Sequence, residues 1–203
     1  MKIICVARNY VAHAKELNNP LPEEPMFFMK HEECIVLGNQ PFHHPDFSDD
    51  IHHEVEVVLR ISREGKNIER GSALSYFDKI ALGIDFTARD LQQKARTRGA
   101  PWEIAKSFDQ SAPLSEFLSL EEVGDFNRIT FRLDINGQTV QKGDTGLMIF
   151  PVDVLIAYIS KFVTLKTGDL IFTGTPAGVG PVKVGDRLEA WLGDKKMMDF
   201  YVR

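Results

Sequence analysis

The sequence predicts an α+β fold that consists mainly of β-strands. Apolar and polar residues alternate over several segments, whereas helical periodicity is confined to three short ones. The predicted strands also follow one another in runs and do not alternate with helices along the chain. This order favours an α+β or mainly-β arrangement over a parallel sheet built from repeated β-α-β units.

The first elements are short. Residues 3–6 form an apolar run that predicts a buried strand, and residues 10–17 carry apolar side chains at helical spacing. An Asn-Asn-Pro sequence then ends the helix, and residues 26–29 predict a second strand. Residues 38–50 contain mostly proline, histidine and turn formers, and a loop of this length is typical of a functional segment.

The central region predicts two strands and a helix. Residues 51–61 alternate as a strand with one apolar face, and residues 80–86 form a second strand. Residues 89–98 predict a helix that ends at Gly99. The predicted apolar face of the first strand carries His53, Val55, Val57, Leu59 and Ile61, and the opposite face carries Glu54, Glu56, Val58 and Arg60.

Strands dominate the C-terminal part. Residues 129–135 alternate, and Asn136-Gly137 predicts a hairpin into a partner strand. Residues 151–162 begin with proline and predict a helix. The last forty residues, 164–203, predict strands arranged as a small twisted barrel or roll. The apolar stripe of the predicted helix consists of Val154, Leu155, Tyr158, Ile159 and Phe162.

Length and composition set the class of protein. A chain of 203 residues can bury a sizeable core, so we expect one domain over residues 1–203. Hydrophobic residues make up 43% and charged residues 26%, as in ordinary globular proteins. The net charge of -5 and the scattered basic residues leave no basic stripe for phosphates, which argues against a nucleic-acid partner.

The cysteines and the apolar runs bear on the compartment. Cys5 and Cys34 each lie in an apolar run, which predicts buried free thiols and not a disulfide framework. The apolar run at the N-terminus is too short for a signal peptide, and no window approaches the roughly 20 apolar residues of a membrane span. We therefore expect a cytoplasmic protein without a membrane partner.

Three carboxylates are candidate metal ligands. Glu54 and Glu56 are two apart on a predicted strand, so they share a face and could bind one hard cation. A solvated strand face is the alternative. Asp85 ends a buried apolar run, where a charge needs a partner. It could be a third ligand or the cap of the helix that starts nearby.

The type of ligand indicates the metal. Three carboxylates without a thiolate suit magnesium or manganese, which prefer oxygen. His52 and His53 beside the pair could argue for zinc, but alternation turns His53 away from Glu54. We expect these histidines to act, if at all, through hydrogen bonds around the site.

Four further residues could carry chemistry. His13 and Glu16 are three apart on the first predicted helix, so the carboxylate could orient the imidazole, or both could be an exposed pair. Lys106 lies among apolar neighbours and is either functional or a surface lysine. Gln92, on the helix after Asp85, could reach a cation-bound ligand or be exposed.

A loop rich in glycine and proline follows the predicted strand at residues 170–172. It spans residues 173–181 and includes Thr175, but it lacks the lysine and the spacing of a phosphate-binding P-loop. Its glycines permit either a tight turn or a close approach of the backbone to a ligand.

Five segments together resemble the catalytic domain of the fumarylacetoacetate hydrolase family, in the same order and over nearly the whole chain. The short acylpyruvase and oxaloacetate decarboxylase branch is the most similar. The segments are Ala7-Arg8-Asn9-Tyr10 with His13 and Glu16, His53-Glu54-Val55-Glu56, Asp85 to Asp90 with Gln92, Lys106-Ser107-Phe108-Asp109, and Thr173 to Gly180.

The resemblance implies a mixed β-sandwich roll with a few short helices, a homodimer, and magnesium or manganese held by Glu54, Glu56 and Asp85. It assigns catalytic roles to His13, Glu16 and Lys106, and substrate contacts to Arg8, Gln92 and Thr175. The chain departs from the family where Lys30 is followed by His31-Glu32-Glu33, since many relatives have proline after the lysine. Because this change lies near the expected pocket, it bears on which group the substrate carries at its far end.

The hypothesis from these residues is a metal-dependent enzyme that breaks a carbon-carbon bond in a small 2-oxo acid through a metal-stabilised enolate. Hydrolysis of an acylpyruvate would use His13, backed by Glu16, to activate water, whereas decarboxylation of oxaloacetate needs no water. The alternatives are an isomerase or tautomerase of an unsaturated 2-oxo diacid and a non-catalytic metal- or ligand-binding relative.

Overall fold

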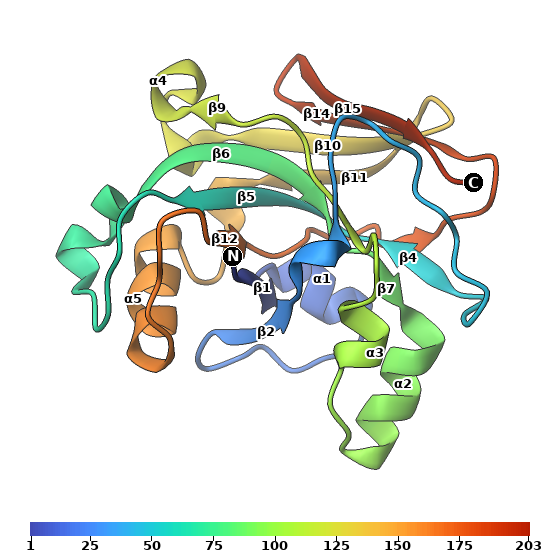
Figure 1. Ribbon diagram of the computed structural model, residues 1–203, viewed down its shortest axis with the longest axis horizontal. Helices are drawn as coiled ribbons and strands as arrows, with labels where there is room; N and C mark the ends of the chain where they lie inside the picture. The colour runs from blue at the N-terminus through green and yellow to red at the C-terminus, as the bar shows by residue number, and fades with distance from the viewer.

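The computed structural model describes residues 1–203, and strands predominate in it (Figure 1). The fold is mainly β, as the sequence patterns predict, and it is the mixed sandwich that the family resemblance implies, although it has five α-helices and not about three. The helices are α1 (Val11–Glu16), α2 (Arg89–Arg98), α3 (Glu103–Lys106), α4 (Leu120–Val123) and α5 (Val152–Phe162), with 3-10 turns η1 (Glu32–Cys34), η2 (Arg70–Tyr76), η3 (Phe126–Arg128) and η4 (Thr145–Leu147). The strands are β1 (Ile3–Ala7), β2 (Met26–Lys30), β3 (Ile35–Val36), β4 (Ile51–His53), β5 (Val55–Ile61), β6 (Phe77–Ile84), β7 (Thr87–Ala88), β8 (Ala112–Pro113), β9 (Leu118–Ser119), β10 (Thr130–Ile135), β11 (Gln138–Asp144), β12 (Leu170–Phe172), β13 (Gly180–Pro181), β14 (Arg187–Leu192) and β15 (Lys195–Tyr201).

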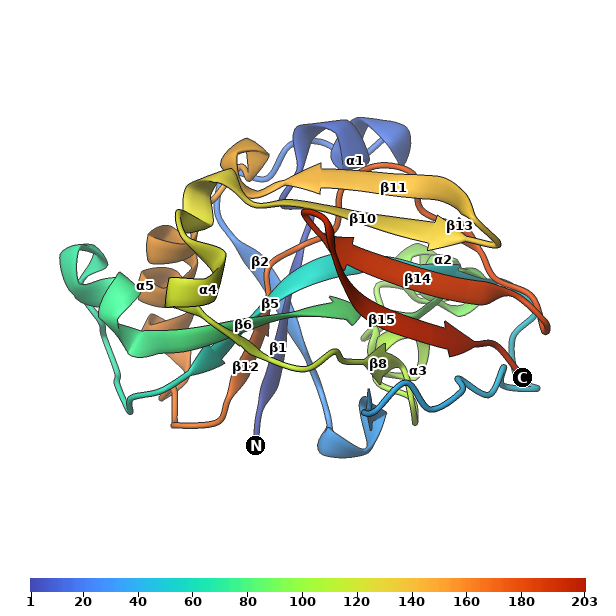
Figure 2. The same ribbon diagram turned by 90° about the horizontal axis from the view of Figure 1, so that it is seen from above.

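Two large sheets form the sandwich. The first has six strands in the order β2-β1-β12-β5-β6-β9, and it is mixed because β1 pairs in parallel with β12 while its other pairs are antiparallel. The second has the order β11-β10-β14-β15, and Figure 2 shows these four strands side by side. The two remaining sheets, β13-β4-β7 and β3-β8, are small.

The main core lies between the two large sheets. Val55, Val57, Leu59 and Ile61 of β5 belong to one buried cluster with residues of β10, β14, β15 and α5, so the predicted apolar face is confirmed. The other face of β5 is also covered, because Val58 packs in a second buried cluster with residues of β1, β8 and β12. Glu54 and Glu56 lie on this second face, which is buried and not solvated.

Local signals set several element ends. The helix α2 ends at Gly99, whose φ of +62° is the left-handed conformation expected of a C-terminal glycine. The turn between β10 and β11 has positive φ at Asn136 and at Gly137, as a two-residue hairpin with this sequence requires.

Two expectations about the C-terminal half are wrong. Residues 164–203 do not form a barrel or roll of their own, because β12 joins the six-stranded sheet while β14 and β15 join the other. The buried face of α5 is also rotated from the predicted stripe. Val152, Leu155, Ile156 and Ile159 are buried, but Phe162 is exposed. The neighbouring η2 and sheet decide which face of the helix is buried.

The small elements gather at one end of β5 and β6. There the chain leaves β6 and forms β7, α2 and α3, while α1 lies close by (Figure 1). No helix is long and apolar enough to cross a membrane.

Candidate active site

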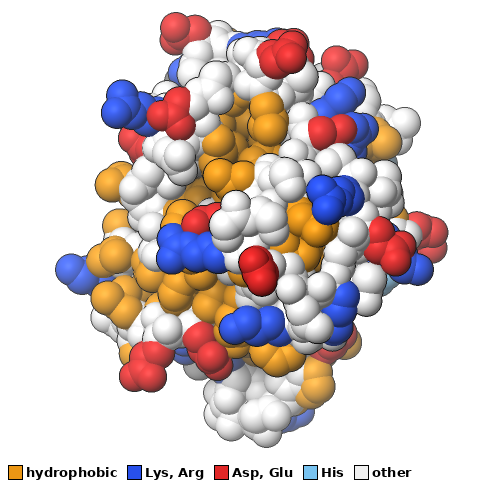
Figure 3. All heavy atoms as spheres, turned by 90° about the vertical axis from the view of Figure 1, so that its left-hand side faces the viewer, with side chains coloured by type: hydrophobic (Ala, Val, Ile, Leu, Met, Phe, Trp, Pro, Cys, Tyr) orange, Lys and Arg blue, Asp and Glu red, His pale blue; other side chains and the backbone are white.

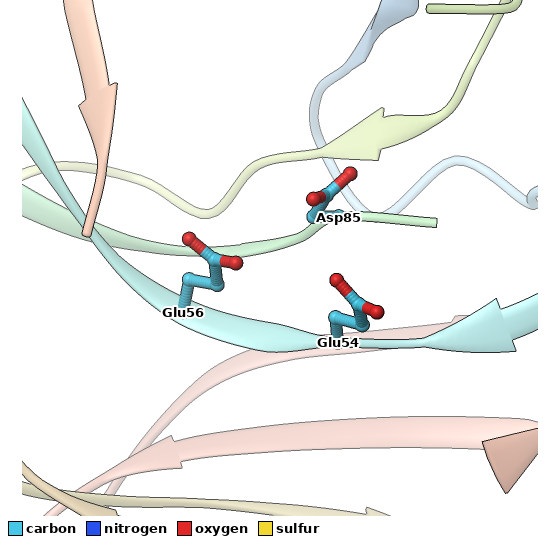
Figure 4. A group of neighbouring side chains, drawn as sticks. All are labelled: Glu54, Glu56 and Asp85. Carbon is cyan, nitrogen blue, oxygen red and sulfur yellow. The ribbon is translucent and has the colours of Figure 1, made fainter. Parts of the chain in front are cut away.

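Three buried carboxyl groups lie together where β5 and β6 meet the small elements. Glu54 occupies the break between β4 and β5, Glu56 follows it on β5, and Asp85 comes directly after β6. The N–H of Asp85 donates to the carbonyl of Glu54 at 2.8 Å, which fixes the two segments side by side. One oxygen of each carboxylate lies within 4.8 Å of the others, and Figure 4 shows the three groups on the same side of the strands.

The burial of these groups decides between the alternatives left by the sequence. Glu54 is 5% exposed, Glu56 2% and Asp85 1%, so the pair is not a solvated strand face. Asp85 does not cap α2 either, because that helix begins at Arg89 with Ala88 at its N-cap. The carboxylates therefore face one another, as the metal-ligand interpretation requires.

Two of the carboxylates have cationic partners from the protein. The ammonium of Lys106 lies 2.8 Å from Glu54 Oε2 and 2.7 Å from Asp85 Oδ2, and a guanidinium nitrogen of Arg89 lies 2.5 Å from Glu54 Oε1. Burial alone would raise the pKa of Glu54, but Lys106 and Arg89 hold that pKa well below its usual range. Glu54 is thus ionised.

Glu56 has no such partner. Its Oε2 accepts a hydrogen bond from the N–H of Gly174 at 2.7 Å, but no lysine or arginine forms an ion pair with it. Burial, followed by the charges of Asp85 and Glu54, raises the pKa of Glu56 well above its usual range. A divalent cation among the three groups would supply the missing positive charge.

One oxygen of Asp85 is in an ion pair but has no hydrogen bond. Lys30 lies 2.9 Å from Asp85 Oδ1, but this buried oxygen has no partner with hydrogen-bond geometry. Three buried carboxyl groups, one of them without a cationic partner, fit a hard, oxygen-preferring cation such as Mg²⁺ or Mn²⁺. The residues present therefore suit a resident divalent metal.

Lys106 is part of this cluster and not a surface lysine. It ends α3, is 3% exposed, and its ammonium also lies 5.0 Å from the centre of the Phe28 ring. Burial lowers the pKa of Lys106, but Asp85 and Glu54 outweigh that effect and raise it. Lys106 consequently carries a fixed positive charge in the site.

The helix α1 places His13 beside the carboxylates. His13 is 5% exposed, which rules out the exposed-pair interpretation, and its Nδ1 donates to Glu16 Oε2 at 3.4 Å. Burial lowers the pKa of His13 although Glu54 and Glu16 act in the opposite direction. A neutral imidazole with Nδ1–H held by a carboxylate has a free Nε2 that can accept a proton.

The loop over residues 173–181 closes around the site. Its glycines approach other parts of the protein closely: a Cβ on Gly174 would lie 2.6 Å from Cβ of Asn9, and one on Gly178 would lie 2.1 Å from the carbonyl oxygen of Val140. This packing brings the N–H of Gly174 to Glu56 and the N–H of Gly178 to Glu16, at 2.7 and 2.9 Å. The glycines therefore allow the loop backbone to pack closely against other parts of the protein, where a side chain would not fit.

A single pocket collects most of the residues predicted to function. Glu16 does not line it, but its carboxylate contacts His13, which does. The helix residue Gln92 is buried and accepts a hydrogen bond from Arg89 at 2.7 Å. The predicted residues that line the pocket are Arg8, His13, Glu54, Glu56, Asp85, Gln92, Lys106 and Thr175.

The two histidines next to Glu54 stand apart from the carboxylates. His52 Nε2 pairs with Asp50 at 2.9 Å, and His53 Nδ1 with Gln141 Oε1 at 2.9 Å. The Gln141 amide donates to the carbonyl of Pro176, which fixes its orientation, so His53 must carry its proton on Nδ1. Neither imidazole forms a hydrogen bond or an ion pair with the three carboxylates.

Sequence reasoning missed several polar residues that build the site. Gln141 accepts from the N–H of Val55 at 3.1 Å and donates to Thr175 Oγ1 at 2.9 Å, so it joins β11, β5 and the loop. Asn9 donates to the carbonyl of Thr173 at 2.8 Å. Lys30 and Arg89 are ion-pair partners of the carboxylates. Asn9 and Arg89 lie within the family-like segments, and Lys30 precedes the departure from the family at residues 31–33, so these three could have been found from the resemblance. Gln141 had no such signal.

The chain is similar to known proteins over nearly its whole length. Residues 2–201 match the family model described as fumarylacetoacetate (FAA) hydrolase C-terminal. A mitochondrial oxaloacetate decarboxylase of Dictyostelium discoideum is 45% identical over 94% of this chain and 88% of its own length. A mitochondrial oxaloacetate tautomerase of Mus musculus is 39% identical over 99% and 91%. The crystal structure of fumarylpyruvate hydrolase from Pseudomonas aeruginosa, in complex with Mn²⁺ and pyruvate, matches with a TM-score of 0.95 and 35% identity, over 100% of this chain and 89% of that one.

Proposed function

The chain belongs to the fumarylacetoacetate hydrolase family and is an enzyme of it, and on this premise we propose that residues 1–203 form one catalytic domain that cleaves a carbon-carbon bond in a small 2-oxo acid. The observation that carries the proposal is the buried cluster of Glu54, Glu56 and Asp85 with His13 on the wall of the same pocket. Acylpyruvate hydrolysis and oxaloacetate decarboxylation are the two reactions to test.

Glu54, Glu56 and Asp85 would hold the metal, which is Mg²⁺ or Mn²⁺ in this proposal. When bound, a divalent cation would draw electrons from the 2-oxo group and so stabilise the negative charge left on the pyruvate portion. The burial of all three carboxyl groups and the lack of a cationic partner for Glu56 support this assignment. Mn²⁺ in the Pseudomonas aeruginosa enzyme also supports it.

In hydrolysis, the neutral imidazole of His13 would take a proton from water through Nε2 while Glu16 holds Nδ1–H. The hydroxide adds to the distal carbonyl carbon, the carbon-carbon bond breaks, and its electron pair passes to the pyruvate portion, which is then protonated. Lys106 provides a fixed positive charge near the developing negative charge. Arg8, Gln92 and Thr175 line the pocket and would orient the substrate.

Tautomerisation of a 2-oxo diacid is the second candidate, because the Mus musculus relative is an oxaloacetate tautomerase. That reaction moves a proton between carbon and oxygen without breaking a carbon-carbon bond. His13 could carry this proton as well, since it is neutral and accessible from the pocket.

The test is release of pyruvate from acetylpyruvate and from oxaloacetate, with EDTA and then with added Mg²⁺ or Mn²⁺. Glu56→Gln keeps an oxygen to accept from Gly174 but loses a charged ligand, so we expect metal-dependent turnover to fall roughly 100-fold or more. Glu116→Gln, at an exposed position outside the pocket, is the matched control.

The outcomes separate the candidates. Metal-dependent pyruvate release by the parent chain and by Glu116→Gln, but not by Glu56→Gln, supports cleavage. Enol-keto conversion of oxaloacetate without pyruvate release supports the tautomerase instead. No conversion of either acid, despite metal binding, favours a non-catalytic metal-binding protein.

A homodimer and a cytoplasmic location are further parts of the proposal. In Figure 3, hydrophobic side chains gather on the face that carries η2 and α5, where Leu74 is 54% and Phe162 58% exposed. A second copy could cover this face, and light scattering of the purified chain tests whether it forms a dimer.

Two buried free thiols suit a reducing compartment such as the cytoplasm, although the relatives from Dictyostelium discoideum and Mus musculus are mitochondrial. Fractionation of cells tests the location.

A further inference from the structure

Gln141 is a buried polar side chain that reaches from one large sheet toward the carboxylate cluster of the other. It lies on β11, the edge strand of the four-stranded sheet (Figure 2), and is 1% exposed. The pairing of β11 with β10 shifts by one residue at this point, which leaves Val140 as a bulge between Thr139 and Gln141. Bulges of this kind occur next to functional sites, where they redirect a side chain.

The amide of Gln141 is fully hydrogen-bonded, and its partners fix its orientation. Its Nε2 donates to Thr175 Oγ1 at 2.9 Å and to the carbonyl of Pro176 at 3.0 Å. Its Oε1 accepts from the N–H of Val55 at 3.1 Å and from Nδ1–H of His53 at 2.9 Å. A backbone carbonyl can only accept and a backbone N–H can only donate, so a reversed amide would lose both backbone contacts. The side chain therefore has one orientation.

These contacts replace backbone pairing that the six-stranded sheet lacks at this place. The strand β12 ends at Phe172, and the chain then turns away from β5 at Gly174, whose φ is +104°. The N–H and the carbonyl of Val55 have no strand partner there, and the side chains of Gln141 and Thr175 bond them instead. Without these side chains, the start of β5 would contain buried backbone groups that have no partner, which is costly.

The two segments that Gln141 joins each hold one glutamate of the carboxylate cluster. Glu54 is flanked on both sides by the residues that donate to Gln141 Oε1. On the other side, the loop over residues 173–181 brings the N–H of Gly174 to Oε2 of Glu56 at 2.7 Å. Gln141 thus ties the segment that carries Glu54 to the loop that holds Glu56.

We propose that Gln141 is a positioning residue for the metal site. It fixes the loop against the start of β5, so that Glu54 and Glu56 keep the arrangement in which they bind a divalent cation together with Asp85. This inference rests on the proposed function, because that proposal assigns the metal to these three groups. Gln141 forms no hydrogen bond with any of the three carboxylates and acts through the segments that carry or hold them. Partners that orient metal ligands in this way typically contribute roughly 10- to 100-fold to metal affinity.

The alternative is that Gln141 only satisfies buried polar groups. In that case its loss would destabilise the fold, as the loss of any buried hydrogen-bonding side chain does, but the folded protein would bind metal with unchanged affinity. Ser160 provides this comparison, because it is 0% exposed, accepts from the N–H of Ile68 at 2.9 Å and does not line the pocket. Metal affinity therefore distinguishes a positioning role from a purely structural one.

The experiment is a calorimetric titration of the folded chain with Mn²⁺, with urea unfolding measured in parallel. Gln141→Met keeps a side chain of similar length but removes its hydrogen bonds, and we expect its Kd for Mn²⁺ to rise roughly 10- to 100-fold above that of the parent chain. Ser160→Ala should lower the urea midpoint and leave this Kd unchanged. Gln138→Met, at an exposed glutamine of the same strand, is the matched control and should change neither quantity.

If Gln141→Met does not fold, Gln141→Asn takes its place. The shorter side chain keeps an amide but cannot reach Val55 and Pro176 together, so the same rise in Kd is expected.

A folded variant at position 141 that binds Mn²⁺ as tightly as Gln138→Met overturns the inference, whatever its stability, while the proposed metal site stands. A parent chain that binds no Mn²⁺ overturns both. Binding is measured without turnover, so failure of the catalytic proposal remains distinguishable. A chain that loses Mn²⁺ affinity in Gln141→Met but releases no pyruvate from either test substrate would retain the positioning role and lose the cleavage reaction.

Discussion

The backbone N–H of Gly178 donates a hydrogen bond to Oε1 of Glu16 at 2.9 Å. The other oxygen of the same carboxylate accepts from Nδ1 of His13 at 3.4 Å. Glu16 therefore links the helix α1 to the loop over residues 173–181 and at the same time orients the imidazole of His13. Both functions can be separated by substitution.

The variant Glu16→Gln keeps an oxygen for the N–H of Gly178 but turns an amide N–H toward Nδ1 of His13. That change favours the tautomer with the proton on Nε2, which cannot act as the base. We expect the kcat of acylpyruvate hydrolysis to fall roughly 100-fold or more with little change in KM, because the base is lost while the loop contact stays. Steady-state kinetics with Lys15→Gln, an exposed change on the same helix, provide the comparison. An unchanged kcat would contradict the orienting role.

The lowered pKa of His13 sets the pH dependence of hydrolysis. Since the unperturbed value is about 6.5 and burial lowers it, the imidazole stays neutral into mildly acidic solution. We expect kcat/KM to be level through neutral pH and to fall only as the pH drops through this lowered value. His13→Ala should lower hydrolysis by roughly 100 to 10,000-fold and remove this limb, while sparing decarboxylation more. Equal losses of both activities, or a limb that survives in His13→Ala, would speak against a base role.

Gly178 can be replaced only at a cost. Its φ is +97°, and a Cβ would lie 2.1 Å from the carbonyl oxygen of Val140, so the loop must move in Gly178→Ala. We expect a loss of about 1–3 kcal/mol in the free energy of unfolding, with slower hydrolysis because the contact with Glu16 breaks. Gly185→Ala is a close control: φ is +98°, but nothing lies within 4 Å of the added Cβ. Chemical denaturation should show a smaller loss in the free energy of unfolding for Gly185→Ala than for Gly178→Ala. Steady-state kinetics should show no loss of activity in Gly185→Ala.

Local patterns predicted the elements better than their partners. The end of α2 at Gly99 and the hairpin at Asn136-Gly137 depend on backbone conformations that particular residues favour, so they could be predicted from a few neighbours. The buried face of α5 depends on η2 and the sheet that cover it. Strand β12 pairs with β1 and β5, and strand β14 pairs with β10, all of which are distant in the sequence. No local pattern contains that information.

The residues of the candidate site also fall into those that local patterns predict and those that only the fold brings together. Alternation placed Glu54 and Glu56 on one face, and the buried run before Asp85 marked a charge that needed a partner. Gln141 and Lys30 could not be identified as parts of the site from local patterns, because each reaches its partners across more than thirty residues of sequence. In the sequence Lys30 is simply a lysine at the end of a strand, whereas the fold buries it against Asp85.

The burial of Lys30 leads to a prediction about charge compensation. Its ammonium lies 2.9 Å from Asp85 Oδ1, donates to Ser111 Oγ at 2.8 Å and also donates to the carbonyl of Lys106. Lys30→Met removes the cation and leaves Asp85 with less compensation, and breaking one partner of a buried ion pair costs roughly 3–5 kcal/mol. We expect a loss of this size without metal.

A divalent cation bound beside Asp85 would replace part of the missing positive charge, so saturating Mn²⁺ should make the loss smaller in Lys30→Met than without metal. Urea unfolding of the parent chain and the variant, each with EDTA and with Mn²⁺, measures both differences. Lys66→Met, at an exposed lysine that donates only to the carbonyl of Lys161, controls for the change of residue type and should show no such difference between EDTA and Mn²⁺. If Lys30→Met lost the same free energy under both conditions, Asp85 would have to be compensated by Lys106 alone and the cation would lie closer to Glu56.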